Sequence, residues 1–126
     1  QLLVDLSEFI LAFKDNNRVI GFILLMREGN KYHSENYKYM SSRFDKFLYI
    51  DRIAIQKNYR RRGLGEKIYS EVISKSKKLN LDVLCEVNTR PRNDPSIAFH
   101  KKMGFEEIGT NDFEKNSVVY LKRSSI

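Results

Sequence analysis

The first half of the chain carries short apolar runs separated by polar turns. Residues 8–14 and 18–26 are rich in Phe, Ile, Val and Leu. The intervening residues 15–17 (Asp-Asn-Asn) tolerate turn conformations, so the two runs predict a β-hairpin. Residues 47–55 form a nearly continuous apolar run, which is typical of a strand covered on both faces. The pattern therefore predicts three strands before residue 56.

After residue 60 the apolar positions change to helical spacing. Leu64, Ile68 and Val72 recur while Lys and Glu fill the other face, which predicts an amphipathic helix that ends near Asn80. Residues 81–87 then alternate apolar and polar positions, as a strand does.

A second helix is predicted from Asp94, because the Pro that follows suits the first helical position. Gly104 is typical of the residue just after a helix end. Two final strands are expected at 105–110 and 117–123. Residues 27–46 are polar, have no clear period and predict a long loop with one helical turn, and loops of that length are often functional.

The predicted order is three strands, a helix, a strand, a helix and two strands, which indicates an α/β fold with a mixed sheet. The strand–helix–strand unit over 47–87 should make its two strands parallel. A length of 126 residues fits one domain, residues 1–126.

The positive charge is concentrated in two segments. The net charge is +7, and residues 57–78 hold eight Lys and Arg against two Glu, a net of +6. Residues 89–103 hold four Lys and Arg against one Asp, a net of +3. A polyanionic partner, either nucleic acid or a phosphate-rich cofactor, would explain this placement, and a solvated basic helix face is the alternative.

Composition narrows the setting of the protein. Cys85 is the single cysteine and cannot form an internal disulfide, so a reducing, cytoplasmic location is expected. No run approaches the ~18 apolar residues of a membrane span, and the first residues do not have the pattern of a signal peptide. We expect a soluble protein with Cys85 in the core, and no metal, because no His, Cys and Asp cluster has ligand spacing.

The segment between the strand at 47–55 and the helix at 64–79 has the composition of a phosphate-binding turn. It reads Arg60, Arg61, Arg62, Gly63, Leu64, Gly65. Glycines let the backbone approach a ligand closely, and the free N–H groups of a helix start favour an anion. The glycine spacing does not fit a Walker A loop, which requires Gly-Lys followed by Ser or Thr. A flexible basic turn is the alternative.

Two motifs resemble those of the GNAT acyltransferase superfamily. Arg60-x-x-Gly63-x-Gly65 matches its short signature, and residues 93–105 resemble its Asn-x-x-[Ala/Ser] segment ending in Gly-Phe. The joint match covers residues 47–109, and FLYIDRIAI, CEVN and SIAFH resemble a bacterial branch of predicted acetyltransferases. This resemblance implies a mixed, largely antiparallel sheet with a central, splayed parallel strand pair, a β-bulge in 47–55 and flanking helices. Family members usually begin with a strand and one or two helices, so the resemblance also implies that these are lacking here, because either a leading segment is omitted from this sequence or the protein is a shortened variant.

The resemblance implies acetyl-CoA as the cosubstrate. Backbone groups at 53–55 would bind the pantetheine arm, and the turn at 60–65 would hold the pyrophosphate. Asn93 would reach the pantetheine or would simply start its helix. The residues implied in cofactor binding are Ile53, Ala54, Ile55, Arg60, Arg61, Arg62, Gly63, Leu64, Gly65, Asn93, Ser96, Phe99 and His100.

The implied chemistry is direct attack of a primary amine on the thioester. An alkylamine has a pKa of about 10, so a base is needed at neutral pH. Asp51 is the first candidate, on a strand face expected to carry Tyr49, Ile53 and Ile55 as well; alternatively it pairs with a nearby arginine. Glu86 is the other candidate base.

His100 stands where most family members have a tyrosine that protonates the leaving thiolate. An imidazole with a pKa of about 6.5 can do the same; the alternative is a helix-surface histidine that bonds the sulfur or water. The acceptor is expected to be a small-molecule or peptide amine, and a homodimer is compatible with the family. The rival functions are a non-catalytic coenzyme A-binding module and a nucleic-acid-binding domain. Nucleic acid is disfavoured because residues 57–78 lack interleaved aromatics.

Overall fold

A computed structural model of the chain describes residues 2–7, 10–60 and 63–126. The described residues form a mixed α/β fold with seven strands, three α-helices and one short 3-10 helix. The elements are β1 (Leu2–Ser7), β2 (Ile10–Asp15), β3 (Arg18–Arg27), α1 (Glu35–Arg43), β4 (Leu48–Ile55), η1 (Lys57–Tyr59), α2 (Leu64–Leu79), β5 (Val83–Arg90), α3 (Asp94–Lys102), β6 (Glu106–Asp112) and β7 (Ser117–Arg123).

The strands make one sheet in the order β1-β2-β3-β4-β5-β7-β6. Every neighbouring pair in the described sheet is antiparallel except β4 and β5. The predicted parallel pairing of the strands on either side of α2 is therefore confirmed. That pairing is short, because only Leu48↔Val83 and Tyr49↔Leu84 face each other in register.

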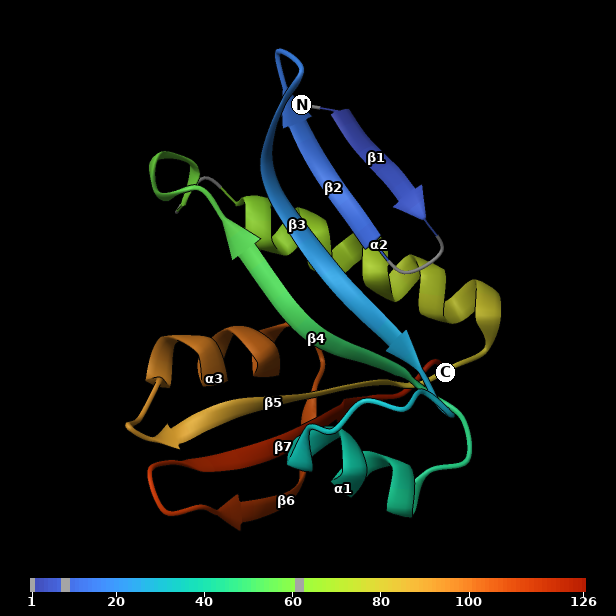
Figure 1. Cartoon of the computed structure of the whole chain (residues 1–126). Coiled ribbons are helices and arrows are strands. Elements are labelled where there is room, and N and C mark those ends of the chain that lie inside the picture. The colour runs from blue at the N-terminus through green and yellow to red at the C-terminus, as the bar shows by residue number, and fades with distance from the viewer. Residues whose placement is uncertain (1, 8–9, 61–62) are drawn as a thin grey trace.

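Beyond Tyr49 the two central strands diverge, and Figure 1 shows β4 running away from β5 toward η1. A β-bulge lies where the divergence begins. Leu24 pairs with Arg52 and Leu25 with Ile50, so Asp51 is the extra residue on β4. Bulges bend the strand that carries them and increase its twist, which explains why the gap, here called the splay, opens at this point.

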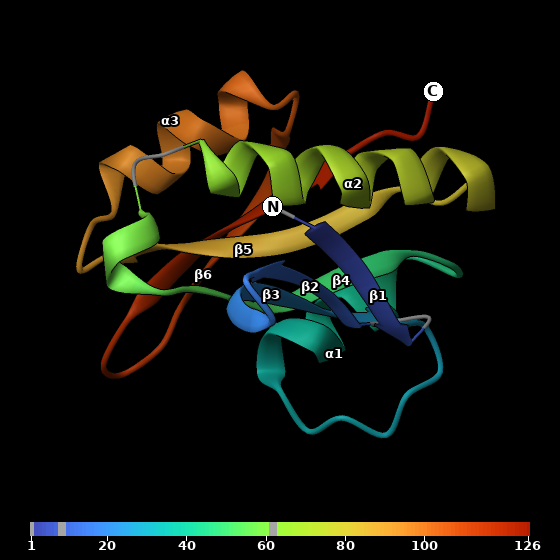
Figure 2. The same cartoon turned by 90° about the horizontal axis from the view of Figure 1, so that it is seen from above.

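Helices cover both faces of the sheet. Figure 2 shows α2 and α3 on one face and α1 on the other. Each face has its own buried cluster: Ile68 and Val72 of α2 belong to the first, and Tyr37 and Met40 of α1 belong to the second. In the described part of the chain, no helix combines the length and the apolar composition that a membrane crossing needs.

Two elements differ from the sequence-based expectation. The strand β1 was not predicted, and residues 27–46 contain the nine-residue helix α1 rather than a loop with one turn. The helix starts at Ser34, whose hydroxyl accepts a hydrogen bond from Tyr37 N at 3.3 Å. Only Tyr37 and Met40 of α1 are buried, so its apolar stripe is too narrow to give a clear helical period.

Candidate active site

Three adjoining chambers form a continuous groove from the start of α2 to the splay. The first has a volume of about 310 Å³, the second about 740 Å³ and the third about 210 Å³. Adjacent chambers share lining residues. Ile55, Arg60 and Phe99 line the first and second, and Arg52, Ile53 and Ser96 line the second and third.

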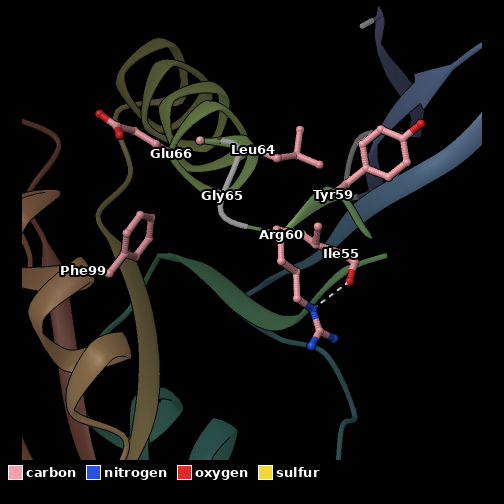
Figure 3. Close-up of a pocket in the computed structure, with 8 residues that line it drawn as sticks. Ile55, Tyr59, Arg60, Leu64, Gly65, Glu66 and Phe99 are labelled. Carbon is pink, nitrogen blue, oxygen red and sulfur yellow. Dashed lines mark hydrogen bonds between the residues drawn. The ribbon is translucent and has the colours of Figure 1, made fainter. Parts of the chain in front are cut away.

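The first chamber lies at the start of α2, where Leu64 and Gly65 line it (Figure 3). Gly63, the residue before the helix, lines it as well. Gly63 is exposed, with φ of 74°, and a Cβ added there would meet no atom within 4 Å. The helix begins with Lys67 N donating to Gly63 O at 3.1 Å. Helix geometry leaves the N–H groups of the first turn of α2 without intrahelical partners. The helix dipole also makes this end of α2 attractive to an anion. The predicted phosphate-binding turn thus opens onto free space.

Arg60 lies between the first and second chambers. Its Nε donates to Ile55 O at 3.2 Å, as Figure 3 shows. The preceding residue, Tyr59, is also held in position, because its hydroxyl donates a hydrogen bond to Asp15 Oδ2 at 2.6 Å. The predicted phosphate contacts of Arg61 and Arg62 lie outside the described residues.

The second chamber runs between β4 and α3. Ile53, Ala54 and Ile55 line one side, and Ser96 and Phe99 line the other. Within the described sheet, β4 has no strand partner on its β5 side beyond Tyr49. Backbone polar groups of this edge are therefore left without a ladder, as an open strand edge requires.

Asn93 both starts α3 and lines the third chamber. Its side-chain oxygen accepts a hydrogen bond from Ser96 N at 3.3 Å. The helix-start role considered in the sequence is therefore present, and the side chain lies at the groove as well.

The strand face expected to hold Tyr49, Asp51, Ile53 and Ile55 together does not exist. Tyr49 packs in the cluster on the α1 side, whereas Ile55 packs against the cluster on the α2 side. The prediction assumed an uninterrupted period of two residues. The extra residue at Asp51 shifts that period, so that odd-numbered positions before and after the bulge lie on opposite faces.

The third chamber lies in the splay and holds both candidate bases, Asp51 and Glu86. The Tyr49 hydroxyl donates to Glu86 Oε1 at 2.6 Å. Burial raises the pKa of Glu86 to about 7, with the negative charge of Asp51 acting in the same direction and hydrogen bonds from Tyr49 and Asn36 opposing it. A carboxyl group with this pKa exchanges protons readily at neutral pH.

Helix α1 and the loop before it supply groups that sequence analysis missed. Asn36 accepts a hydrogen bond from the Tyr120 hydroxyl at 2.8 Å, and its amide lowers the pKa of Glu86. The Asp51 carboxyl group raises the pKa of Tyr32. The tyrosine content of residues 27–46 was the only available signal, and it did not identify Asn36.

His100 is buried, with 6% of its surface exposed, so the alternative of a helix-surface histidine is wrong. Its Nδ1 lies 2.7 Å from Ser96 O. A carbonyl oxygen only accepts, so Nδ1 carries the proton and Nε2 accepts from the Tyr69 hydroxyl at 2.7 Å. Burial lowers the pKa of His100, which favours the neutral ring.

Cys85 is buried in the cluster on the α2 side, where the sequence placed it. Burial raises the pKa of its thiol well above the ordinary range, so it is a neutral core group. Across the described residues, His, Cys, Asp and Glu side chains form no group of three or more that could hold a metal ion.

Comparisons with known proteins agree with this geometry. The Acetyltransferase (GNAT) family model matches residues 2–105. The chain is 27% identical over 132 residues to the Bacillus subtilis (strain 168) protein named "Putative acetyltransferase YjbC", covering 91% of this chain and 67% of that protein.

Solved acetyltransferases share the fold. The Arabidopsis thaliana Naa50 structure, in complex with the bisubstrate analogue CoA-Ac-MVNAL, has a TM-score of 0.70 at 23% identity, covering 93% of this chain and 73% of that one. The ribosomal-protein-S18-alanine N-acetyltransferase of Escherichia coli also gives 0.70, at 16% identity, covering 91% of this chain and 67% of that one. Because the family model matches most of the chain, this protein belongs to the GNAT family of acetyltransferases.

Proposed function

We propose that this protein is an N-acetyltransferase that moves an acetyl group from acetyl-CoA to a primary amine by direct attack. The observation that carries the proposal is the groove itself. It joins an open helix start to the splay, where Glu86 has a pKa of about 7.

The groove fits coenzyme A at the end where phosphates would bind. Gly63 presents its backbone to open space at the start of α2, which is the arrangement that suits a pyrophosphate. The amides of Gly63, Leu64 and Gly65 would hold that group. Arg60 would add a charge-assisted contact after leaving Ile55 O.

The open edge of β4 would bind the pantetheine arm. Residues 53–55 line the second chamber opposite Ser96 and Phe99, and their side chains are ordinary apolar groups. Recognition would therefore use backbone N–H and C=O groups, in the way that an added strand pairs with a sheet edge. Asn93 would contribute its amide from the wall of the third chamber.

Glu86 would act as the general base. It would accept a proton from the acceptor ammonium, and the resulting amine would attack the thioester carbonyl as the C–N bond forms. Tyr49 and Asn36 would hold the carboxyl in place. Asp51 would support the base by its charge, which contributes to the raised pKa of Glu86.

The acceptor would enter from the α1 side, because Glu86 accepts its hydrogen bond from Tyr49, which packs in the cluster on that side. The Naa50 complex contains a peptide joined to coenzyme A, which supports an amine of a peptide or of a small molecule as the acceptor. Two carboxylates in the third chamber would attract a cationic amine.

A non-catalytic coenzyme A-binding module is the second candidate. It is favoured by His100, whose two ring nitrogens are both occupied within the protein. Release of free coenzyme A from acetyl-CoA with a panel of amines separates the two functions. Binding without release for every amine would favour the module.

The cofactor site is tested by calorimetric titration of coenzyme A into Gly63→Asp. A carboxylate there would occupy the open space and repel the pyrophosphate, so we expect binding to be lost. Gly29→Asp is the matched control, because Gly29 also has positive φ, 80°, and open space around a Cβ, but does not line the groove chambers. Equal affinity in the two variants would refute the site.

A further inference from the structure

A phenol–imidazole pair lines the groove, and the proposed function gives it no role. Tyr69 of α2 and His100 of α3 both line the third chamber. They are 3% and 6% exposed, and the Tyr69 hydroxyl lies 2.7 Å from His100 Nε2. Because each group provides the hydrogen-bond partner of the other, both are held in a defined position at the wall of the third chamber.

The surroundings fix the imidazole more firmly than the phenol hydroxyl. The His100 ring packs edge-on against Tyr69, Phe99 and Phe105, with centroid distances of 5.1, 5.6 and 5.2 Å. Its Nδ1–H donates to Ser96 O, so the ring has no other proton to offer. The Tyr69 hydroxyl needs only rotation about its C–O bond to direct its proton elsewhere.

We propose that Tyr69, oriented by His100, donates a hydrogen bond to the coenzyme A sulfur as the thioester is cleaved. This inference rests on the proposed function, because it requires coenzyme A in the groove. Tyr69 would be the catalytic residue, and His100 would be the positioning residue that holds the hydroxyl at the chamber wall in the resting state.

The step balances without an added reactant. The acceptor nitrogen forms a bond to the acetyl carbon, and the C–S bond breaks with its electron pair remaining on sulfur. Glu86 holds the proton taken from the amine. Tyr69 keeps its own proton and turns it from His100 Nε2 to the sulfur, and the thiolate is protonated by water after release.

Moving the Tyr69 hydrogen bond from His100 to the sulfur stabilises the transition state more than the ground state. In the resting protein the Tyr69 proton is in a hydrogen bond between neutral partners, whereas a developing thiolate is charged. Charge-assisted hydrogen bonds are about twice as strong as neutral ones. The gain therefore grows as sulfur becomes negative, which is how an interaction accelerates a step rather than merely binding a substrate.

The other charged groups and the thiol that line this chamber are poorer partners for the sulfur. Asp51 and Arg52 come from β4, and Cys85 and Glu86 come from β5. The Asp51 carboxylate would disfavour a nearby thiolate, and the Cys85 thiol is a weak donor. Arg52 is exposed, so solvent screens its charge.

The pKa of the bound coenzyme A thiol tests the proposal without turnover. It can be followed by the ultraviolet absorption of the thiolate across a pH series, with coenzyme A saturating. In Tyr69→Phe we expect the thiol pKa to rise by about one unit, a tenfold loss of thiolate stabilisation. Tyr37→Phe is the matched control, since it also removes a buried phenol hydrogen bond, to Arg27 O at 2.5 Å, but lies outside the groove.

A second variant separates the phenol from the imidazole. Gln at position 100 offers Tyr69 an amide oxygen but cannot become a cationic acid, so His100→Gln should keep the thiol pKa low. A rise in His100→Gln together with no rise in Tyr69→Phe would overturn the proposal in favour of the histidine. An unchanged thiol pKa in Tyr69→Phe, at wild-type coenzyme A affinity, would also overturn it. Failure of the wild-type protein to bind coenzyme A would instead reject the proposed function on which it rests.

Discussion

Tyr49→Phe removes the hydroxyl that donates to Glu86 Oε1 at 2.6 Å and leaves the buried ring in place. This hydrogen bond stabilises the charged carboxylate and so opposes the effect of burial on the pKa of Glu86. Its loss should therefore raise the pKa further. If Glu86 is the general base, activity will need a higher pH.

The size of the effect follows from the bond that is lost. A hydrogen bond to a charged group contributes ~1.5–3 kcal/mol, and one pKa unit corresponds to ~1.4 kcal/mol. The pKa of Glu86 should thus rise from about 7 by roughly one to two units. At pH 7 the active fraction would fall from about half to between roughly a tenth and a hundredth, and activity would recover at higher pH.

The assay is coenzyme A release against pH, at saturating acetyl-CoA and amine, with the midpoint of the acidic limb as the readout. Tyr59→Phe is a matched control, because it removes a phenol–carboxylate hydrogen bond of the same length, 2.6 Å, from Asp15. Its midpoint should stay at the wild-type value. A midpoint that stays fixed or falls in Tyr49→Phe would refute the assignment of Glu86 as the base.

Three further predictions concern stability. Because its pKa is raised from 4.5 to about 7, Glu86 binds its proton more tightly in the folded state than in the unfolded state. The folded state should therefore lose roughly 3–3.5 kcal/mol of stability as pH rises through this window. Glu86→Gln should remove that loss. Its free energy of unfolding at pH 8, measured by chemical denaturation, should exceed that of the wild type, although the variant should be inactive. An added Cβ at Gly109 would collide with the Tyr39 hydroxyl. The collision would disturb the stacking of Tyr39 on Tyr120, whose ring centroids lie 3.7 Å apart. Gly109→Ala should therefore lower the free energy of unfolding by ~1–3 kcal/mol. Ser34→Ala removes the α1 cap and should cost ~1 kcal/mol, visible as a lower Tm.

Much of the fold could be predicted because local pattern and tertiary role agree in the centre of the chain. The helix α2 has a wide apolar stripe and a left-handed Asn80 at its end, and both leave clear marks in the sequence. The helix α1 does not, because it buries little and is held by its cap and by Tyr37. Contacts that depend on three-dimensional neighbours leave no periodic trace.

The candidate site likewise has one part that the sequence predicts and another part that it does not. The turn at Gly63 could be predicted because its chemistry is local: glycine, arginine and a helix start lie within a few residues. The environment of Glu86 could not, since its partners Tyr49 and Asn36 come from β4 and α1. The buried Tyr69–His100 pair likewise joins residues 31 positions apart.

The bulge at Asp51 divides β4 into two halves that have different tasks. Before it, Tyr49 bonds Glu86, while Ile53, Ala54 and Ile55 after it line the chamber that would take the pantetheine arm. Evolution could therefore retune acceptor choice through the first half of the strand and leave the second half unaltered. Deleting Asp51 would leave the pairing of β4 with β3 intact, because Ile50 already pairs with Leu25 and Arg52 with Leu24. The later side chains would keep their faces, but β4 would lose the bend that opens the splay, and the groove between the two central strands would narrow.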